Sequence, residues 1–393
     1  MSVLTLVLCS CVGLVAYTYI GYPALLMLVG AFRPRRKPAA PPAQWPMISI
    51  VVPAYNEEAQ IRGLLDSLLA LDYPADRRQI VVVSDASTDG TDRIVAEYAD
   101  RGIELIRMPK RVGKTGAENY VRKMLRGEIV INTDASTRID PAAVRALVAE
   151  FSDPTVGVAS GRDVSVARAD ETLNVGESGY VGYEMWVRDL ETRVSGIVGA
   201  SGCLYAIRAD LHRHLLPEAL SRDFAAPLVA REAGKRAISV PNALCAVPRT
   251  SSLRREYRRK VRTFTRGMET LFFKRQLLNP FRYGVFAWML WSHKVCRWLV
   301  PWAGVAAVVS LLFLAIEHAW ARWALLPIAA AGALALAGWH WPEGRRAPRV
   351  LSIPAYFAAA NIAVIEAWLR ALRGELNPIW EPTRREALEG QAR

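Results

Sequence analysis

The sequence predicts an α/β protein in which a mostly parallel, doubly wound sheet domain is combined with transmembrane and interfacial α-helices. Two observations lead to this fold class. Between residues 48 and 132, short apolar runs alternate with helical stretches, which is typical of parallel sheets with crossover helices. In addition, three uncharged runs are close to or above the ~20 residues that cross a bilayer. They are residues 1–32, 298–316 and 323–341.

The uncharged runs favour membrane spans over buried core helices, because three such runs in one chain are uncommon in a core. Residues 1–32 have no basic n-region and exceed the length of a signal-peptide core, so we expect a retained anchor. The basic cluster 33–37 follows, which predicts an external N-terminus and a cytoplasmic sheet domain. The net charge of +13 gathers beside the spans and in residues 254–275, which favours a solvated face or contact with anionic lipid over nucleic-acid binding.

These boundaries divide the chain into six expected segments. They are a transmembrane anchor (1–32), a basic Pro- and Ala-rich linker (33–46), the α/β domain (47–275), an interfacial amphipathic helix (276–297), a C-terminal transmembrane region (298–373) and a basic tail (374–393). Residues 350–365 are uncharged but are followed by charged residues. The sequence leaves open whether they span, dip into or lie on the membrane, and therefore on which side the C-terminus lies.

Within the α/β domain, each element follows from a local pattern. Apolar, β-branched runs predict strands at 48–52, 79–84, 103–108, 128–132 and 203–207, with one long strand or a strand pair at 156–166. Apolar stripes and capping residues predict helices at 57–71, 91–101, 114–126, 141–151, 171–194, 221–233 and 254–275. For the helix predicted at 221–233, Ser221 is the expected N-cap.

The stretch 128–137 is an apolar run that ends on Asp134 and continues into a hydroxyl-rich turn. Alone, it favours a strand capped by an Asx turn. Glu57 and Asp85 also follow predicted strands, and Asp223 comes later in the chain. Parallel strands share one carboxyl edge, so we expect a cluster of carboxylates there. If such a cluster binds a diphosphate, a divalent cation such as Mg²⁺ or Mn²⁺ has to join the negative groups.

The segment Lys110–Thr115 contains Gly-Lys-Thr but is not a P-loop, because Met108 stands where the first glycine of that motif is required. No G-x-G-x-x-G follows a predicted strand, so the dinucleotide-binding fingerprint is also missing. A basic loop that neutralises a diphosphate and a solvated surface loop both remain open for this segment.

Three stretches of the α/β domain carry a recognisable pattern, namely Ile50–Glu58, Val83–Thr91, and Arg111–Lys114 with Asn119. Together they resemble the family 2 glycosyltransferases, in particular the membrane-embedded, inverting type related to poly-N-acetylglucosamine, hyaluronan and cellulose synthases. The resemblance covers residues 47–275 and implies a GT-A domain, which is Rossmann-like with a mostly parallel sheet. The flanking apolar segments are similar to those of the membrane-bound branch.

The resemblance implies a role for each acidic turn. Glu57 and Asp85 would contact the uracil and ribose of a UDP-sugar, and Lys114 would belong to a basic loop at the diphosphate. Asp134 would be the first acid of a DxD-type motif that binds Mg²⁺ or Mn²⁺. Here the sequence departs from the family, because Ser136 replaces the second acid.

Further along, Asp223 matches the last acid of the catalytic-base motif, although Arg222 replaces the acid before it. Residues 199–202 resemble the loop near the acceptor. Arg262 keeps the arginine of the Q-x-x-R-W signature and would stabilise the leaving diphosphate, but the Gln and Trp are missing, which puts processive synthesis in doubt. Residues 380–384 resemble a W-x-x-T-R element after the last span.

The implied function is that of a multi-pass inner (plasma) membrane hexosyltransferase with a cytoplasmic catalytic domain. It would transfer a sugar, with inversion, from a UDP-sugar to a growing polysaccharide or a lipid-linked acceptor, with polysaccharide export components as further partners and no nucleic acid. One alternative is transfer of a single sugar to a polyprenyl-phosphate carrier, which the size of the product would distinguish. Another is a non-catalytic membrane partner in polysaccharide export, which would release no UDP.

Overall fold

The sheet is built around three strands that are buried along almost their whole length. A computed structural model describes residues 2–34, 39–166, 175–248, 252–342, 345 and 347–375. In this part of the chain the strand order of the sheet is β3-β2-β1-β4-β7-β6-β8-β5. The strands are β1 (Ile48–Ala54), β2 (Arg78–Ser84), β3 (Ile103–Arg107), β4 (Ile129–Thr133), β5 (Arg138–Ile139), β6 (Val156–Val166), β7 (Leu204–Arg208) and β8 (Arg236–Pro248). All of β1 is buried, as expected for a central strand that is covered on both faces.

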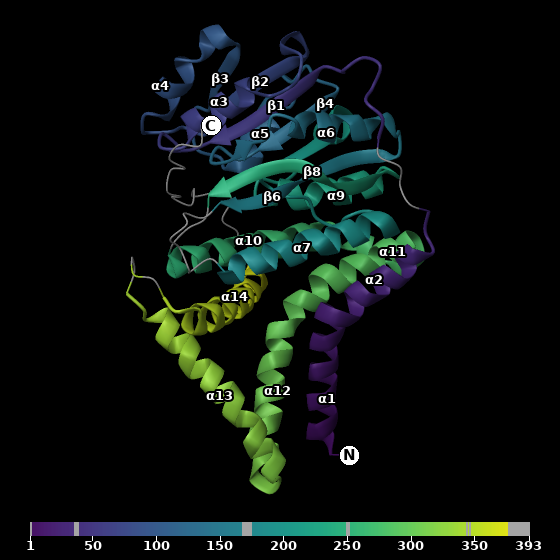
Figure 1. The fold of residues 1–393 in the computed structure, drawn as a ribbon, viewed down its shortest axis with the longest axis vertical. Coiled ribbons are helices and arrows are strands. Elements are labelled where there is room, and N and C mark those ends of the chain that lie inside the picture. Colours follow the sequence, from purple (N-terminus) through teal and green to yellow (C-terminus); the bar gives the residue numbers. More distant parts are fainter. Residues whose placement is uncertain are drawn as a thin grey trace.

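Helices cover both faces of this sheet and produce two hydrophobic cores. On one face, Ile50 of β1 packs in a cluster with Leu64 of α3; on the other face, Val51 packs with Ala117 of α5. The helices of the domain are α3 (Ile61–Leu69), α4 (Thr91–Ala96), α5 (Lys114–Val121), α6 (Ala143–Ala149), α7 (Val175–Val194), α8 (Ala209–His212), α9 (Arg222–Glu232) and α10 (Leu253–Phe273). Single 3₁₀ turns lie at Ala75–Arg77, Ala99–Arg101, Glu150–Ser152 and Arg275–Leu278. The long helices α7 and α10 lie below the sheet (Figure 1).

The predicted fold class is confirmed. Strands β1 to β4 pair in parallel, and β6 pairs in parallel with β8, whereas β7 runs antiparallel between β4 and β6. Strand β8 is not among the predicted elements, because Pro241 and Asn242 interrupt its apolar pattern. Its pairing with β6 shifts register after Ser160 and Ser239, and Pro241 lies in that irregular stretch. A bulge accommodates a residue that has no N–H to donate.

Several helices of the domain are shorter than the sequence predicts, among them α3, α4, α5 and α6, and hydrogen bonds explain the bounds of two. The helix expected from residue 57 begins at Ile61, because the backbone N–H groups of Gln60 and Ile61 both bond to the carbonyl of Glu57 in a turn. The helix expected to reach residue 126 ends at Val121. There the Arg126 N–H bonds to the side chain of Gln79 instead of to a helical carbonyl.

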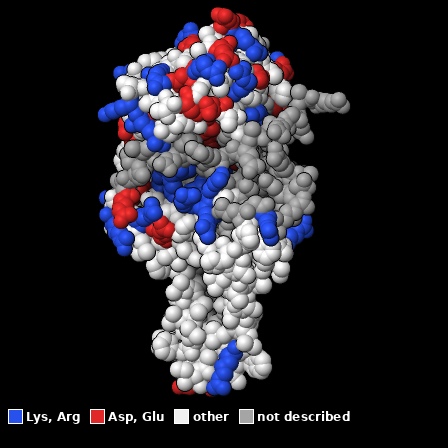
Figure 2. Space-filling model, turned by 90° about the vertical axis from the view of Figure 1, so that its left-hand side faces the viewer, with Lys and Arg blue, Asp and Glu red and all other residues white. Residues whose placement is uncertain are grey.

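The apolar helices lie on one side of the sheet domain. Within the described residues, four helical stretches are long and apolar enough to cross a membrane, namely Val3–Ala31, Pro280–Glu317, Ala319–Trp339 and Arg349–Leu372. The first stretch consists of α1 (Val3–Ala16) and α2 (Tyr22–Ala31), joined by the π-helical turn Tyr17–Gly21. The second consists of α11 (Pro280–Leu290), the π-helical segment η7 (Trp291–Cys296) and α12 (Arg297–Glu317). The last two are α13 (Ala319–Trp339) and α14 (Arg349–Leu372). Helices α1, α12 and α13 extend away from the sheet (Figure 1). Figure 2 shows that the corresponding part of the surface carries almost no charge except near its lower end, while basic side chains gather above it.

The interfacial helix expected at 276–297 falls on a 3₁₀ turn, α11 and η7, which continue into α12 within the stretch Pro280–Glu317. The backbone of Gly284 inside α11 is non-helical (φ 51°) and marks a kink. The stretch Pro280–Glu317 has 38 residues, which exceeds the ~20 that cross a bilayer. The residues of α11, at its start, are therefore not needed to cross the bilayer and are available to lie at its surface. Helix α14 contains the residues whose placement the sequence left open, and it packs against α10 and α13. The tail element expected at 380–384 lies outside the described residues.

Gly127 supplies a direct test of how closely β4 and β1 are joined. A Cβ at this position would lie 2.3 Å from the backbone nitrogen of Ser49, so we expect Gly127→Ala to lower the stability by at least about 1–3 kcal/mol. The matched control is Gly182→Ala in α7, where a Cβ meets nothing within 4 Å and gains helix propensity. Thermal unfolding of both variants in detergent measures the difference. Equal melting temperatures would contradict this account of the close approach.

Candidate active site

Three of the predicted acidic residues lie at one edge of the sheet. Glu57 follows β1, Asp85 follows β2 and Asp134 follows β4, and these three strands are parallel neighbours. Their carboxyl ends therefore meet at the same edge, as the sequence predicts. Glu57 and Asp85 are buried, whereas the side chain of Asp134 is 23% exposed.

The turns after β1 and β2 are bonded to each other and form one unit. The side-chain oxygen of Asn56 accepts a hydrogen bond from the Thr88 N–H (2.8 Å), and the Glu57 N–H donates to the Thr91 hydroxyl (2.8 Å). Asn56 and Ala86 both have left-handed backbone conformations, with φ of 52° and 57°. For Ala86 this conformation is uncommon and costs about 1–3 kcal/mol, so the surrounding contacts have to maintain it. Strain of this kind clusters at functional sites.

Asp85 connects this unit to the basic loop. Its two carboxylate oxygens accept hydrogen bonds from the backbone N–H groups of Val112 (2.7 Å) and Gly113 (2.8 Å). Gly113 has a φ of 84° and immediately precedes α5, so a residue with a side chain would be strained there. In the structure, the charge-assisted hydrogen bonds of Asp85 therefore hold the loop that precedes Lys114.

Lys114, the first residue of α5, faces the acidic edge. Its Nζ lies 2.6 Å from Oδ1 of Asp134 and donates to the backbone carbonyl of Gly202 (3.3 Å). Burial alone would lower the pKa of Lys114, but the nearby carboxylates, above all that of Asp134, outweigh it and raise that pKa. The ammonium group therefore stays charged beside Asp134. Ser136, two residues further, is buried.

Asp223 approaches the same point from the first turn of α9. Its backbone carbonyl accepts from the Ala200 N–H (3.4 Å), and a Cβ at position 202 would lie 2.7 Å from its Oδ2. Gly202 is therefore the residue that lets the carboxylate approach the loop. The Ser221 hydroxyl does not cap the helix as the sequence suggests; it donates to Asp223 instead. The predicted base and the loop 199–202 are thus brought together.

Arg222 has a partner that sequence reasoning did not identify. Its Nε lies 3.1 Å from Glu118 of α5, and its guanidinium also contacts Asn119 and the carbonyl of His212. Both members of the pair are buried, and burial raises the pKa of Glu118 while Lys114 and Arg222 oppose that rise. The position where the family has an acid therefore carries the opposite charge, and α5 supplies the acid. The spacing of four residues between Lys114 and Glu118 was the available signal, because it places both on one face of a helix.

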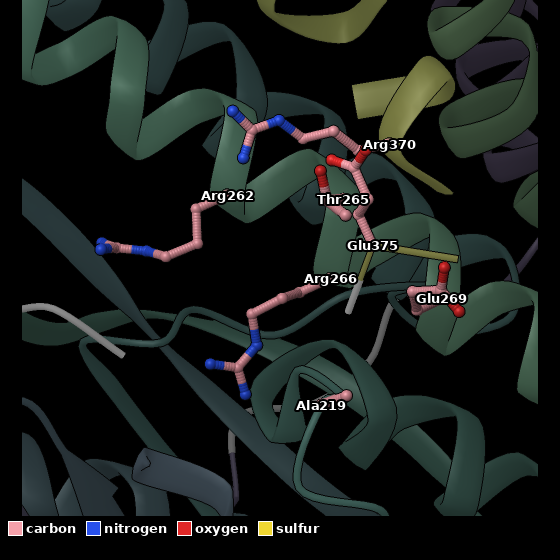
Figure 3. A pocket seen from close by; sticks show the side chains of 7 residues that line it. All are labelled: Ala219, Arg262, Thr265, Arg266, Glu269, Arg370 and Glu375. Atoms are coloured by element: carbon pink, nitrogen blue, oxygen red, sulfur yellow. The ribbon is translucent and has the colours of Figure 1, made fainter. Parts of the chain in front are cut away.

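Arg262 lies on α10 and lines a small pocket at the edge of the domain (Figure 3). The lining residues are Ala219, Arg262, Thr265, Arg266, Glu269, Arg370 and Glu375. In the close view, Arg266 extends from α10 toward the segment of Ala219. Its guanidinium donates to the Leu220 carbonyl (2.5 Å) and to the Thr115 hydroxyl of α5 (3.1 Å). Burial lowers the pKa of Arg266, and the charge of Asp223 acts against this change. Arg266, one helical turn after Arg262, is thus a second cation beside the candidate site.

The residues at the sheet edge fit a divalent cation only when another ligand shares it. Among the described residues, no group of three or more His, Cys, Asp or Glu side chains could hold a metal ion. Asp134 alone represents the acids of the predicted metal motif, since position 136 is a serine. Mg²⁺ is commonly bound by one or two carboxylates together with substrate phosphates and water, and Asp134 satisfies that requirement.

Comparisons with known proteins agree with this geometry. Residues 49–205 match the model of "Glycosyl transferase family 2". The chain contains a family 2 glycosyltransferase domain. The matched stretch begins in β1 and ends in β7, so it includes Glu57, Asp85, Lys114 and Asp134 but stops before Asp223.

Two curated relatives each match part of this chain. An N-acetylglucosaminyltransferase of Rhizobium sp. (strain N33) is 27% identical over 190 residues, which cover 47% of this chain and 41% of the relative. A beta-monoglucosyldiacylglycerol synthase of Nostoc sp. (strain PCC 7120) is 31% identical over 170 residues, which cover 42% of this chain and 36% of the relative. The chain thus matches less than half the length of these relatives.

The whole architecture has a counterpart among solved structures. A mannosyltransferase from Pyrobaculum calidifontis, PcManGT, superposes with a TM-score of 0.71 at 24% identity, covering 94% of this chain and 99% of that one. The fold is therefore a GT-A domain together with apolar helices, as predicted.

The buried pair of Glu118 and Arg222 gives a stability test. We expect Arg222→Met to cost about 3–5 kcal/mol, because it leaves Glu118 buried without its nearest cation. The double variant Glu118→Leu/Arg222→Met removes both charges, and it should recover more than half of that loss. Chemical unfolding in detergent measures both variants. A double variant that is no more stable than the single one would contradict the pairing.

Proposed function

We propose that the chain is a membrane glycosyltransferase that transfers a hexose, with inversion, from a UDP-sugar to a growing polysaccharide or a lipid-linked acceptor. The observation that carries the proposal is the arrangement around Lys114: Asp134 lies on one side of its ammonium, and Asp223 lies against the adjoining Gly202. A donor site and a base for the acceptor are thus within one small region. The glycosyltransferase relatives and the mannosyltransferase solved with GDP-Man and Mn²⁺ support a sugar-nucleotide donor.

On the donor side, each acidic turn receives a role. Glu57 and Asp85 would bind the uracil and ribose. Lys114, which contacts Asp134, would also bind the diphosphate. Asp134, with Ser136 in place of a second acid, would hold Mg²⁺ or Mn²⁺ together with the diphosphate. When bound, the cation would neutralise charge that develops on the departing diphosphate. Arg262 would assist at the same oxygens, with the neighbouring Arg266 as a further cation.

On the acceptor side, Asp223 would act as the general base. It takes the proton from the acceptor hydroxyl while the acceptor oxygen forms a bond to the anomeric carbon. The bond from that carbon to the diphosphate oxygen breaks, and its electron pair stays with the diphosphate. The backbone contact between Asp223 and Ala200 keeps the base beside the loop that would receive the acceptor.

The four apolar helices support a location in the inner (plasma) membrane, with the glycosyltransferase domain on the cytoplasmic side. Transfer of one sugar to a polyprenyl-phosphate carrier is the second candidate, and the missing Trp after Arg262 favours a single transfer over chain growth. Polysaccharide export components would be partners if the product is a polymer. Without transfer, the chain would instead be a non-catalytic member of such an export system.

The primary experiment incubates the full chain in membranes with labelled UDP-sugars and either Mg²⁺ or Mn²⁺, and then sizes the product. We expect one UDP-sugar to give labelled product and free UDP. A polymer indicates a synthase, and a single addition indicates transfer to a lipid carrier. If no UDP-sugar or GDP-mannose gives transfer or hydrolysis, the proposed activity is wrong.

Asp223→Asn tests the general base. We expect it to abolish transfer, a loss of at least about 10²–10⁴-fold, because the amide cannot take the acceptor proton. Binding of the UDP-sugar should stay within a few-fold of the wild type, as measured by calorimetry. Turnover close to the wild-type rate would exclude Asp223 as the base.

Asp134→Ala tests the cation site. We expect this variant to lose the part of UDP-sugar affinity that depends on Mn²⁺, because its carboxylate is the acid available to share the cation with the diphosphate. Calorimetry with and without EDTA measures that part for both proteins. UDP affinity in Mn²⁺ equal to that of the wild type would count against the assignment.

A further inference from the structure

A buried cluster of charged side chains joins α7 to the apolar helices, outside the site described above. Glu191 of α7 and His293 of η7 are 0% and 1% exposed. Oε1 of Glu191 lies 2.5 Å from Nδ1 of His293 and accepts a hydrogen bond of 2.5 Å from the Tyr22 hydroxyl of α2. One carboxylate thus connects the sheet domain with both the N-terminal and the C-terminal apolar segments.

A second carboxylate completes the environment of His293. Nε2 of His293 lies 3.0 Å from Glu184, which also accepts from Arg297 (2.5 Å). Burial alone would raise the pKa of Glu184, but the neighbouring His293 and Arg297 outweigh it and hold that pKa well below its ordinary value. Glu184 therefore stays ionised, and the ring of His293 faces carboxylate oxygens on both nitrogens. Buried ion pairs are often no more stabilising than apolar residues of similar size, so stability alone does not account for this cluster.

From this cluster, contacts lead directly to the loop at the candidate active site. Oε2 of Glu191 accepts from the backbone N–H of Val198 (3.3 Å), the residue before the Gly199–Gly202 loop. The neighbouring Lys294 of η7 reaches the same place: a Cβ at position 199 would lie 3.2 Å from its Nζ. The Nζ of Lys294 also lies 5.3 Å from the ring centre of Phe224, the residue after Asp223.

We propose that Glu191 and Lys294 are positioning residues through which the apolar helices set the Gly199–Gly202 loop and Asp223 for the acceptor. The inference rests on the proposed transfer reaction and adds that membrane attachment determines mainly the geometry of the acceptor side. On the donor side, Asp85 and Lys114 are held mainly by contacts within the sheet domain, at 2.6–2.8 Å, and the longer bond from Lys114 to the Gly202 carbonyl (3.3 Å) is their link to the loop. Disturbing the junction should therefore affect the donor site much less than the acceptor side. A displacement of about 1 Å in a reacting group can cost ~100-fold in rate, so small changes at the junction have measurable effects.

The test uses Glu191→Gln and Lys294→Met in the full chain, in detergent and in lipid nanodiscs. Glu191→Gln keeps the size of the side chain but removes its charge, and Lys294→Met keeps its length but removes the ammonium. The control is Tyr17→Phe, which removes hydroxyl contacts to Ser292 (2.6 Å) and Trp288 (2.9 Å) at the same junction without touching the loop. Lys294→Arg restores a cation and should recover most of the activity.

The readouts separate positioning from general stability. They are the melting temperature, the UDP-sugar affinity by calorimetry, and kcat and KM for whichever acceptor the wild type glycosylates among dioleoylglycerol, a polyprenyl phosphate and a chito-oligosaccharide. We expect Glu191→Gln and Lys294→Met to lower kcat/KM for the acceptor about 10- to 100-fold while UDP-sugar affinity stays within twofold. Tyr17→Phe should keep both constants within twofold even where its melting temperature falls.

Two results would overturn the proposal. One is an unchanged kcat/KM for the acceptor in folded Glu191→Gln and Lys294→Met. The other is a parallel loss of donor affinity and turnover that follows the melting temperature in all variants, including Tyr17→Phe, because that is the behaviour of a merely structural junction. If Glu191→Gln does not fold, the pair of Lys294 variants decides. A wild-type chain that neither transfers nor hydrolyses any sugar nucleotide would instead refute the proposed function itself, and the positioning role with it.

Discussion

The ion pair between Lys114 and Asp134 is the contact around which the candidate active site is arranged. It brings the start of α5 to the end of β4, and Lys114 also reaches the carbonyl of Gly202. Asp85 supports this arrangement, because its carboxylate accepts hydrogen bonds from the backbone N–H groups of Val112 and Gly113, which precede Lys114. A single ammonium group thereby connects the edge of the parallel strands with the loop beside Asp223. An acidic edge of this kind would repel a diphosphate without such a cation.

A second pair of opposite charges, between Glu118 and Arg222, lies buried in the domain. The buried pair of Glu118 and Arg222 lies behind Lys114 and Asp223, and Arg266 contacts Thr115 on the same helix. Helix α5 thus carries residues that balance charge on both the proposed donor side and the proposed acceptor side. The reversal of charge at Arg222, relative to the acidic motif of the family, is tolerated because Glu118 supplies the opposite charge at 3.1 Å.

The two sides of the site are held in different ways. Hydrogen bonds from backbone N–H groups to side chains of the sheet domain hold the proposed donor side, where the turns after β1 and β2 are bonded to each other. The acceptor side takes part of its support from outside that domain, since Glu191 bonds both to Tyr22 and to the N–H of Val198. A glycosyltransferase that uses a soluble donor and a membrane-bound acceptor would benefit from this division, because only the acceptor has to be aligned with the bilayer.

The sequence by itself determined the strands β1, β2 and β4, the acids that follow them and the apolar helices, because each of these depends on a local pattern of apolar residues and turns. It also singled out Asp134, Lys114 and Asp223, which the structure brings together. Only the tertiary structure decided that Glu118 pairs with Arg222, that Arg266 reaches Thr115, and that Glu191 meets His293. These partners are between 102 and 151 residues apart, and strand β8 likewise depends on pairing with β6. Contacts at such separations leave no periodic signal, because packing rather than local conformation determines them.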